Sequence, residues 1–265
     1  MIILTFILLV AGLVTFLLTN FLSLSLWFLP FWIFAGLISG VVVFLITFIG
    51  GSFLAERREI TSRGNHFYAR MISDFALLML KIKIVTVVGK ENLPLNNFVL
   101  YSNHRSNTDP FIIISALRRP LGFAAKSAIF KIPFVKTWLA AIGSININRE
   151  SDRESIKEII KGIKNVEKGA SLAIFPEGGI LSWSNPYLMN IKPGAFRLAT
   201  KPQVPIVPMA IIGSMQVKFN LPWRRTKVKI IVGKPIEYDE YQNLTSVEIG
   251  ELVFEKINNL IKVHL

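Results

Sequence analysis

Residues 98–110, FVLYSNHRSNTDP, join a buried strand to the start of a helix and place a histidine between the two. The apolar run Phe98–Tyr101 is typical of a strand that is buried inside a sheet. Asp109 followed by Pro110 predicts the cap and the first position of a helix. His104 is therefore expected on the loop that leaves the carboxyl end of a strand, where α/β folds carry binding and catalytic side chains.

His104 and Asp109 lie five positions apart at the two ends of this loop, so their side chains can meet. A carboxylate beside an imidazole fixes its tautomer and stabilises its charged form, which leaves the second ring nitrogen free to take a proton from a hydroxyl. The other histidines are His66 and His264, so few residues can act as a proton shuttle. The alternative is that Asp109 is only a helix cap.

Apolar runs alternate with helical patterns along the rest of the chain. Strands are predicted at Ile82–Val88, Leu121–Ala125, Ser144–Ile147, Ala170–Phe175, Val204–Ile212 and Val228–Val232. Helices are predicted at His66–Leu80, from Pro110, from Phe130–Phe134, from a Ser151–Glu154 capping box to Gly169, and from a Thr245–Glu248 capping box to the C-terminus. This alternation predicts an α/β domain with a mixed sheet flanked by helices. The prolines of the Val204–Ile212 strand require an edge position or a bulge.

Residues 1–55 contain no Asp, Glu, Lys, Arg or His, so the whole net charge of +13 belongs to residues 56–265. Two apolar segments, Ile2–Asn20 and Phe31–Ile49, each have the roughly 18–20 residues needed to cross a hydrocarbon core. The missing charged n-region and the length of the apolar run argue against a signal peptide. The sequence therefore predicts a membrane-embedded helical hairpin over 1–55, which either spans twice or dips into one leaflet, and a folded domain over 56–265.

Arg57, Arg58 and Arg63 follow the second apolar segment. This position predicts an integral or monotopic membrane protein whose folded domain faces the cytoplasm and contacts membrane lipids. The other basic residues are dispersed without zinc spacing or an aromatic-interleaved motif, so no nucleic-acid partner is expected. The chain has no cysteine, which excludes disulfides, cysteine-ligated metals and a cysteine acyl-enzyme. No metal or other cofactor is predicted.

Four blocks occur in order along the chain: Asn103-His104-x-Ser106-x-x-Asp109, Gly143-x-Ile145-x-Ile147-Asn148-Arg149, Phe175-Pro176-Glu177-Gly178 and Val204–Pro208. Together they resemble the glycerolipid acyltransferase family, over about Ile82 to Ile236. The resemblance implies transfer of a fatty acyl group from acyl-CoA or acyl carrier protein, as a substrate, to the free hydroxyl of a lysophospholipid. The family's commonest acceptor is 1-acyl-sn-glycerol-3-phosphate, and its product is phosphatidic acid.

The same resemblance assigns roles to individual residues. It implies that His104 is the general base, that Asp109 is its partner, and that the block around Glu177 and Gly178 binds the acceptor. Ser106 could in principle form an acyl-enzyme with His104, but direct transfer is expected, with Ser106 ordering the loop.

The chain departs from the family after Gly178, where Gly179 and Ile180 stand in place of the usual Thr and Arg. That arginine would be the natural ligand of a phosphate, because a guanidinium binds phosphate through two hydrogen bonds. Positive charge could come instead from three other residues: Lys126, Arg149 and Lys192. The Gly178 and Gly179 amides could also bind an anion. The departure equally suits another lysolipid or an amino-acid lipid as acceptor, and a non-catalytic membrane lipid-binding protein is the third interpretation.

Overall fold

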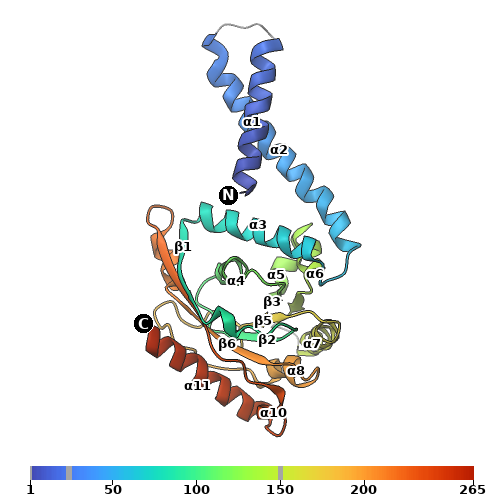
Figure 1. Ribbon diagram of the computed structural model, residues 1–265, viewed down its shortest axis with the longest axis vertical. Helices are drawn as coiled ribbons and strands as arrows, with labels where there is room; N and C mark the ends of the chain where they lie inside the picture. The colour runs from blue at the N-terminus through green and yellow to red at the C-terminus, as the bar shows by residue number, and fades with distance from the viewer. Residues whose placement is uncertain (1, 22–25, 149–151) are drawn as a thin grey trace. The chain divides into compact units, whose positions relative to one another are not determined.

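The computed structural model describes residues 2–21, 26–148 and 152–265, and the chain divides into two compact units, Met1–Arg57 and Arg58–Leu265. In the first unit, α1 (Ile2–Phe21) and α2 (Leu29–Glu56) pack against each other as a hairpin (Figure 1). Both helices are long and apolar enough to cross a membrane. α2 is longer than the predicted segment because the uncharged run continues through Ala55.

Two glycines on α2 let the two helices of the hairpin approach closely. A Cβ atom on Gly36 would lie 2.5 Å from the carbonyl oxygen of Ala11, and one on Gly40 would lie 2.5 Å from that of Ile7. Ile7 and Ala11 are buried in this contact. Small residues four positions apart are a common means of close helix packing in membranes, so the pattern is consistent with a paired hairpin.

In the described part of the second unit, seven strands form one sheet in the order β1-β7-β6-β2-β5-β3-β4. The strands are β1 (Ile82–Val88), β2 (Val99–Ser102), β3 (Gly122–Lys126), β4 (Ile145–Ile147), β5 (Leu172–Ile174), β6 (Ile206–Ile212) and β7 (Thr226–Val232). The β6–β7 pair is antiparallel and the other neighbours are parallel. The predicted mixed sheet is confirmed.

Helices cover both faces of this sheet (Figure 1). They are α3 (Arg63–Met79), α4 (Asp109–Leu117), α5 (Ser127–Phe130), α6 (Val135–Ala141), α7 (Asp152–Glu167), α8 (Arg197–Thr200), α9 (Val217–Asn220), α10 (Tyr238–Tyr241) and α11 (Ser246–His264). Val99 and Tyr101 of β2 pack in the core with α8 and α11, whereas Leu100 packs on the other face with α3 and α4. Burial on both faces explains why β2 has a continuous apolar sequence.

One predicted helix is wrong in position. The stretch Phe130–Phe134 does not open a helix, because α5 ends at Phe130 and α6 begins only at Val135. Phe134 has φ of +62°, which a right-handed helix does not allow, so the chain must break between the two helices.

The proline in the middle of β6 lies at an irregularity, as its sequence requires. Ile206 pairs with Ile236 and Met209 pairs with Val232. The two pairs are three residues apart along β6 but four residues apart along the segment Val232–Ile236. Pro208 lies inside this interval and accepts a hydrogen bond from the Gly233 N–H at 2.8 Å. The extra residue is a bulge, which accommodates a residue without an N–H in an interior strand.

Candidate active site

The loop after β2 brings His104 and Asp109 together. Nδ1 of His104 lies 2.9 Å from Oδ2 of Asp109 and must donate, because a carboxylate only accepts. The same oxygen accepts the backbone N–H groups of Arg105 at 2.7 Å and Ser106 at 2.8 Å. The Asp109 side chain is fully buried, whereas 12% of the His104 side chain is exposed. Nε2 of His104 forms no hydrogen bond with any residue that the structure describes, so it is available to a ligand.

The start of α4 differs by one residue from the prediction. Thr108 occupies the cap position, and Asp109 and Pro110 are the first two helical residues. The Asp109 carboxylate turns back to the loop instead of capping the helix. Ser106 lies 4% exposed, with its hydroxyl 2.8 Å from that of Thr108 and accepting the Thr108 N–H at 3.2 Å. Ser106 therefore uses its hydroxyl within the loop.

Phe175 fixes the plane of the His104 ring. The two rings are stacked, with their centroids 4.1 Å apart and an interplanar angle of 13°. Phe175 directly follows β5, and β5 is the parallel neighbour of β2. The two loops singled out in the sequence, around His104 and Glu177, thus leave the same edge of the sheet from adjacent strands.

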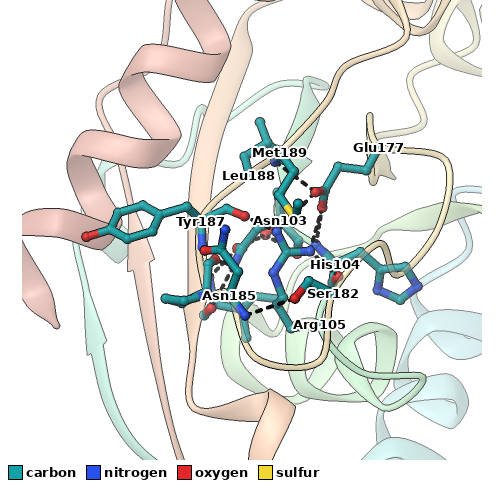
Figure 2. Close-up of polar contacts among 12 residues, drawn as sticks. Asn103, His104, Arg105, Glu177, Ser182, Asn185, Tyr187, Leu188 and Met189 are labelled. Carbon is teal, nitrogen blue, oxygen red and sulfur yellow. Dashed lines mark hydrogen bonds and ion pairs between the residues drawn. The ribbon is translucent and has the colours of Figure 1, made fainter.

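Glu177 is held inside the protein by a buried ion pair with Arg105 (Figure 2). Its Oε2 accepts from Nη1 of Arg105 at 2.8 Å and from the His104 N–H at 3.1 Å. Its Oε1 accepts from Nη2 of Arg105 at 3.0 Å and from the Met189 N–H at 3.0 Å. The two side chains are 1% and 0% exposed. Figure 2 shows the His104 ring turned away from this pair, so the carboxylate connects loops behind the histidine.

Arg105 is a site residue that the sequence motifs did not predict. Its guanidinium also donates to the carbonyl oxygens of His104 and Tyr187. Asn103 makes a second cross-link, since its side-chain amide donates to the carbonyls of Pro186 and Ile211 and accepts the Ile211 N–H. The available signal was a cation directly after His104 in an otherwise uncharged loop, and nothing local identified its partner 72 residues away.

An apolar cavity of about 940 Å³ opens beside His104. Its apolar lining includes Phe123, Ile129, Ile147, Ile156, Ile159, Ile174 and Leu198. Of the predicted site residues, His104, Lys126, Gly178, Gly179 and Lys192 line the cavity, whereas Asp109, Ser106 and Glu177 do not. Arg149 lies outside the described residues. The cavity therefore combines one imidazole, two amines and an apolar surface, in the size range of small-ligand sites.

Gly178 has a backbone conformation that suits glycine, with φ of +72°. A Cβ atom here would lie 2.9 Å from Cε of Lys192, so the glycine also makes room for the lysine. Its N–H donates to the Phe175 carbonyl at 3.0 Å, which leaves this amide unavailable to an anion. Among the described residues, no three His, Asp or Glu side chains come together as candidate metal ligands.

A histidine oriented by a buried carboxylate beside an apolar cavity has a geometry in which its free ring nitrogen can take a proton from a hydroxyl. The sequence profile of the Acyltransferase family matches residues 84–212, which contain His104, Asp109 and Glu177. The chain belongs to the acyltransferase family, and its named relatives are enzymes.

Two relatives show how far the similarity extends. The 1-acyl-sn-glycerol-3-phosphate acyltransferase of Saccharomyces cerevisiae is 32% identical over 230 residues, which cover 85% of this chain and 70% of the yeast protein. A probable enzyme of the same name from Mycoplasma pneumoniae is 30% identical, over 71% of this chain and 74% of its own. The crystal structure of the 1-acyl-sn-glycerophosphate acyltransferase of Thermotoga maritima superposes with a TM-score of 0.66, at 20% identity, over 84% of this chain and 92% of that one. This likeness shows that the fold is shared.

Proposed function

We propose that this chain transfers a fatty acyl group from acyl-CoA or acyl carrier protein to the free hydroxyl of 1-acyl-sn-glycerol-3-phosphate, which gives phosphatidic acid. The observation that carries the proposal is the geometry of His104. Its Nδ1 is held by Asp109 at 2.9 Å, its ring is stacked on Phe175, and it lines the apolar cavity. The acceptor follows the printed names of the yeast and Mycoplasma relatives.

The reaction needs a base from the protein and a nucleophile, which is the hydroxyl of the acceptor itself. Nε2 of His104 takes the proton of the lipid hydroxyl while the hydroxyl oxygen attacks the thioester carbonyl carbon. A C–O bond forms, the C–S bond then breaks, and the proton passes from His104 to the leaving thiolate. Asp109 stabilises the imidazolium between the two transfers. A base positioned in this way contributes roughly 10²–10⁴-fold to the rate.

Lys126 and Lys192 are the candidates for binding the acceptor phosphate. Both side chains are exposed to solvent and line the cavity that contains His104. A lysine acts on phosphate as a point charge, without the two-pronged geometry of arginine. Gly179 and Ile180 stand where the family usually has a threonine and an arginine, so the phosphate-binding arginine is missing from this loop. This departure supports another lysolipid or an amino-acid lipid as the second candidate acceptor.

The apolar hairpin suits this function because the acceptor and the product are both membrane lipids. We place the catalytic unit on the cytoplasmic side, on the basis of Arg57 and Arg58 after α2 and the positive-inside tendency. The donor would then reach the cavity from the water phase.

The test is acyl transfer by the purified full chain in detergent, with labelled acyl-CoA and acyl carrier protein donors. Lysophosphatidic acid is compared with neutral and amino-acid lysolipids. His104→Ala is the test variant and His264→Ala the matched control, since the His264 side chain bonds only the Leu260 carbonyl on α11 among the described residues. Turnover on lysophosphatidic acid that is lost in His104→Ala alone supports the proposal. Turnover only on another acceptor supports the second candidate, and lipid binding without turnover supports a non-catalytic lipid-binding protein.

A further inference from the structure

A second cavity, of about 460 Å³, has four arginines in its lining. Arg63 and Arg70 come from α3, and Arg118 and Arg119 directly follow α4. No residue of this lining is shared with the cavity at His104. The two cavities are associated with opposite ends of α4, because Asp109 begins this helix and Arg118 caps its end.

The positive charge of this second cavity is largely uncompensated. Among the described residues, the one ion pair of the four arginines joins Nε of Arg70 to Asp74 at 3.7 Å. Arg119 donates to the neutral carbonyl oxygens of Pro94 at 2.8 Å and Leu95 at 2.7 Å. The four arginines of the lining thus form a single ion pair among the described residues, and a bound anion would offset the remaining charge.

The pKa of Lys90 is affected by the positive charge of the same arginines. Its amine donates to the Ala116 carbonyl at 3.2 Å, near the end of α4. Burial lowers the pKa of Lys90, and the positive charges of Arg118 and Arg70 lower it further. The repulsion among these cations is a cost that an anionic ligand would relieve.

Two exposed apolar side chains line the same cavity as the arginines. Phe67 is 50% exposed and Leu95 is 90% exposed. Exposed apolar side chains beside basic ones are typical of protein surfaces that bind at the boundary between lipid headgroups and acyl chains.

The length of the chain limits how far Arg63 can lie from the end of α2. Six residues, Arg57–Ser62, separate Glu56 at the end of α2 from Arg63 at the start of α3. Seven steps of extended chain span at most about 25 Å. Arg63, which lines the cavity, is therefore within reach of anionic groups at the surface of a membrane that holds α2.

We propose that the arginine-lined cavity binds the phosphate group of an anionic membrane phospholipid. Guanidinium groups bind phosphate oxygens through paired hydrogen bonds, and Phe67 and Leu95 lie beside them to contact the apolar part of the lipid. The site is separate from the cavity at His104, and its occupation does not depend on acyl transfer.

The test uses the full chain in detergent micelles and exploits its lack of cysteine. Leu95→Cys carries an environment-sensitive fluorophore at the cavity, and Glu255→Cys carries it on α11 as the control position. Dihexanoyl phosphatidylglycerol, dihexanoyl phosphatidylcholine and inorganic phosphate are titrated in turn. The charge variant is Arg63→Gln/Arg118→Gln, and the matched control is Lys256→Gln/Lys262→Gln on α11, which removes the same charge.

The proposal predicts a saturable emission shift at residue 95 with phosphatidylglycerol and none with phosphatidylcholine. Each arginine near an anionic lipid contributes about fivefold to affinity, so the Arg63/Arg118 variant should need about 25-fold more lipid. The control variant should bind as the parent does. Equal effects of both charge variants, an equal shift with phosphatidylcholine, or saturation by inorganic phosphate at the same concentration would each overturn the proposal.

Discussion

Glu177→Gln tests whether the glutamate after β5 organises the active site or binds the acceptor. The wild-type carboxylate accepts four hydrogen bonds, two from Arg105 and one each from the backbone of His104 and Met189. The glutamine side chain has the shape of glutamate but carries no charge. Its NH₂ group is itself a donor, and it would lie opposite two other donors. Arg105, 1% exposed, is then left as an uncompensated buried cation.

Breaking a buried ion pair by removing one partner costs about 3–5 kcal/mol. For a unit of this size, each kcal/mol lowers Tm by about 2–4 °C, so Glu177→Gln should melt roughly 6–20 °C lower. Thermal unfolding in detergent, followed by tryptophan fluorescence, measures the change. Because Glu177 holds the His104 N–H, kcat should fall while KM for the acceptor stays nearly constant.

The double variant Arg105→Leu/Glu177→Leu supplies the matched comparison. It removes both charges and leaves neither partner stranded, so it should be more stable than either single leucine variant. The reasoning is refuted if Glu177→Gln melts with the parent and its only kinetic change is a higher KM. That result would indicate that Glu177 binds the acceptor directly.

Three further predictions concern separate parts of the chain. Lys126→Gln and Lys192→Gln should each raise KM for lysophosphatidic acid several-fold with little change in kcat, as measured by acyl transfer at varied acceptor concentration. Burial lowers the pKa of His66 below its ordinary 6.5. The contribution of the neutral imidazole to stability is therefore complete above pH 6.5 and is lost as the pH falls below 6.5. Urea unfolding at pH values above and below 6.5 should show this loss in the parent and not in His66→Gln. Gly40→Leu places a Cβ atom 2.5 Å from a carbonyl oxygen of α1 and should weaken the hairpin by about 1–3 kcal/mol in detergent unfolding, whereas Gly12→Leu, with nothing within 4 Å of its Cβ, should not.

The sequence was sufficient for the sheet and for the His104 loop. The interior strands are buried on both faces, so each appears as a continuous apolar run, as in β2 and β6. The link between His104 and Asp109 is local, because five residues and a helix start bring them together. The glycine after α7 and the Thr245 capping box also occur where the local signals placed them.

The contacts of Glu177 could not be predicted, because they depend on side chains distant in sequence. Arg105 meets Glu177 across 72 residues, and the side-chain orientations that bury both charges follow from the packing of β2 beside β5. The break at Phe134 escaped prediction for a similar reason, since a positive φ at phenylalanine has no sequence signature and is imposed by its surroundings. Apolar runs predict burial, but they do not specify which polar groups are paired inside.

The central claim is that the charge of Asp109 supports His104 as the catalytic base, and Asp109→Asn tests it most directly. Oδ2 accepts all three hydrogen bonds, while Oδ1 has no partner among the described residues, so an asparagine oxygen can replace Oδ2 while an NH₂ group takes the place of the unpartnered Oδ1 and the charge is removed. A unit charge about 4 Å away is worth about 4 kcal/mol at an effective dielectric of 20. The kcat for acyl transfer by Asp109→Asn should therefore fall about a thousandfold with Tm nearly unchanged. A kcat within a few-fold of the parent would contradict the account.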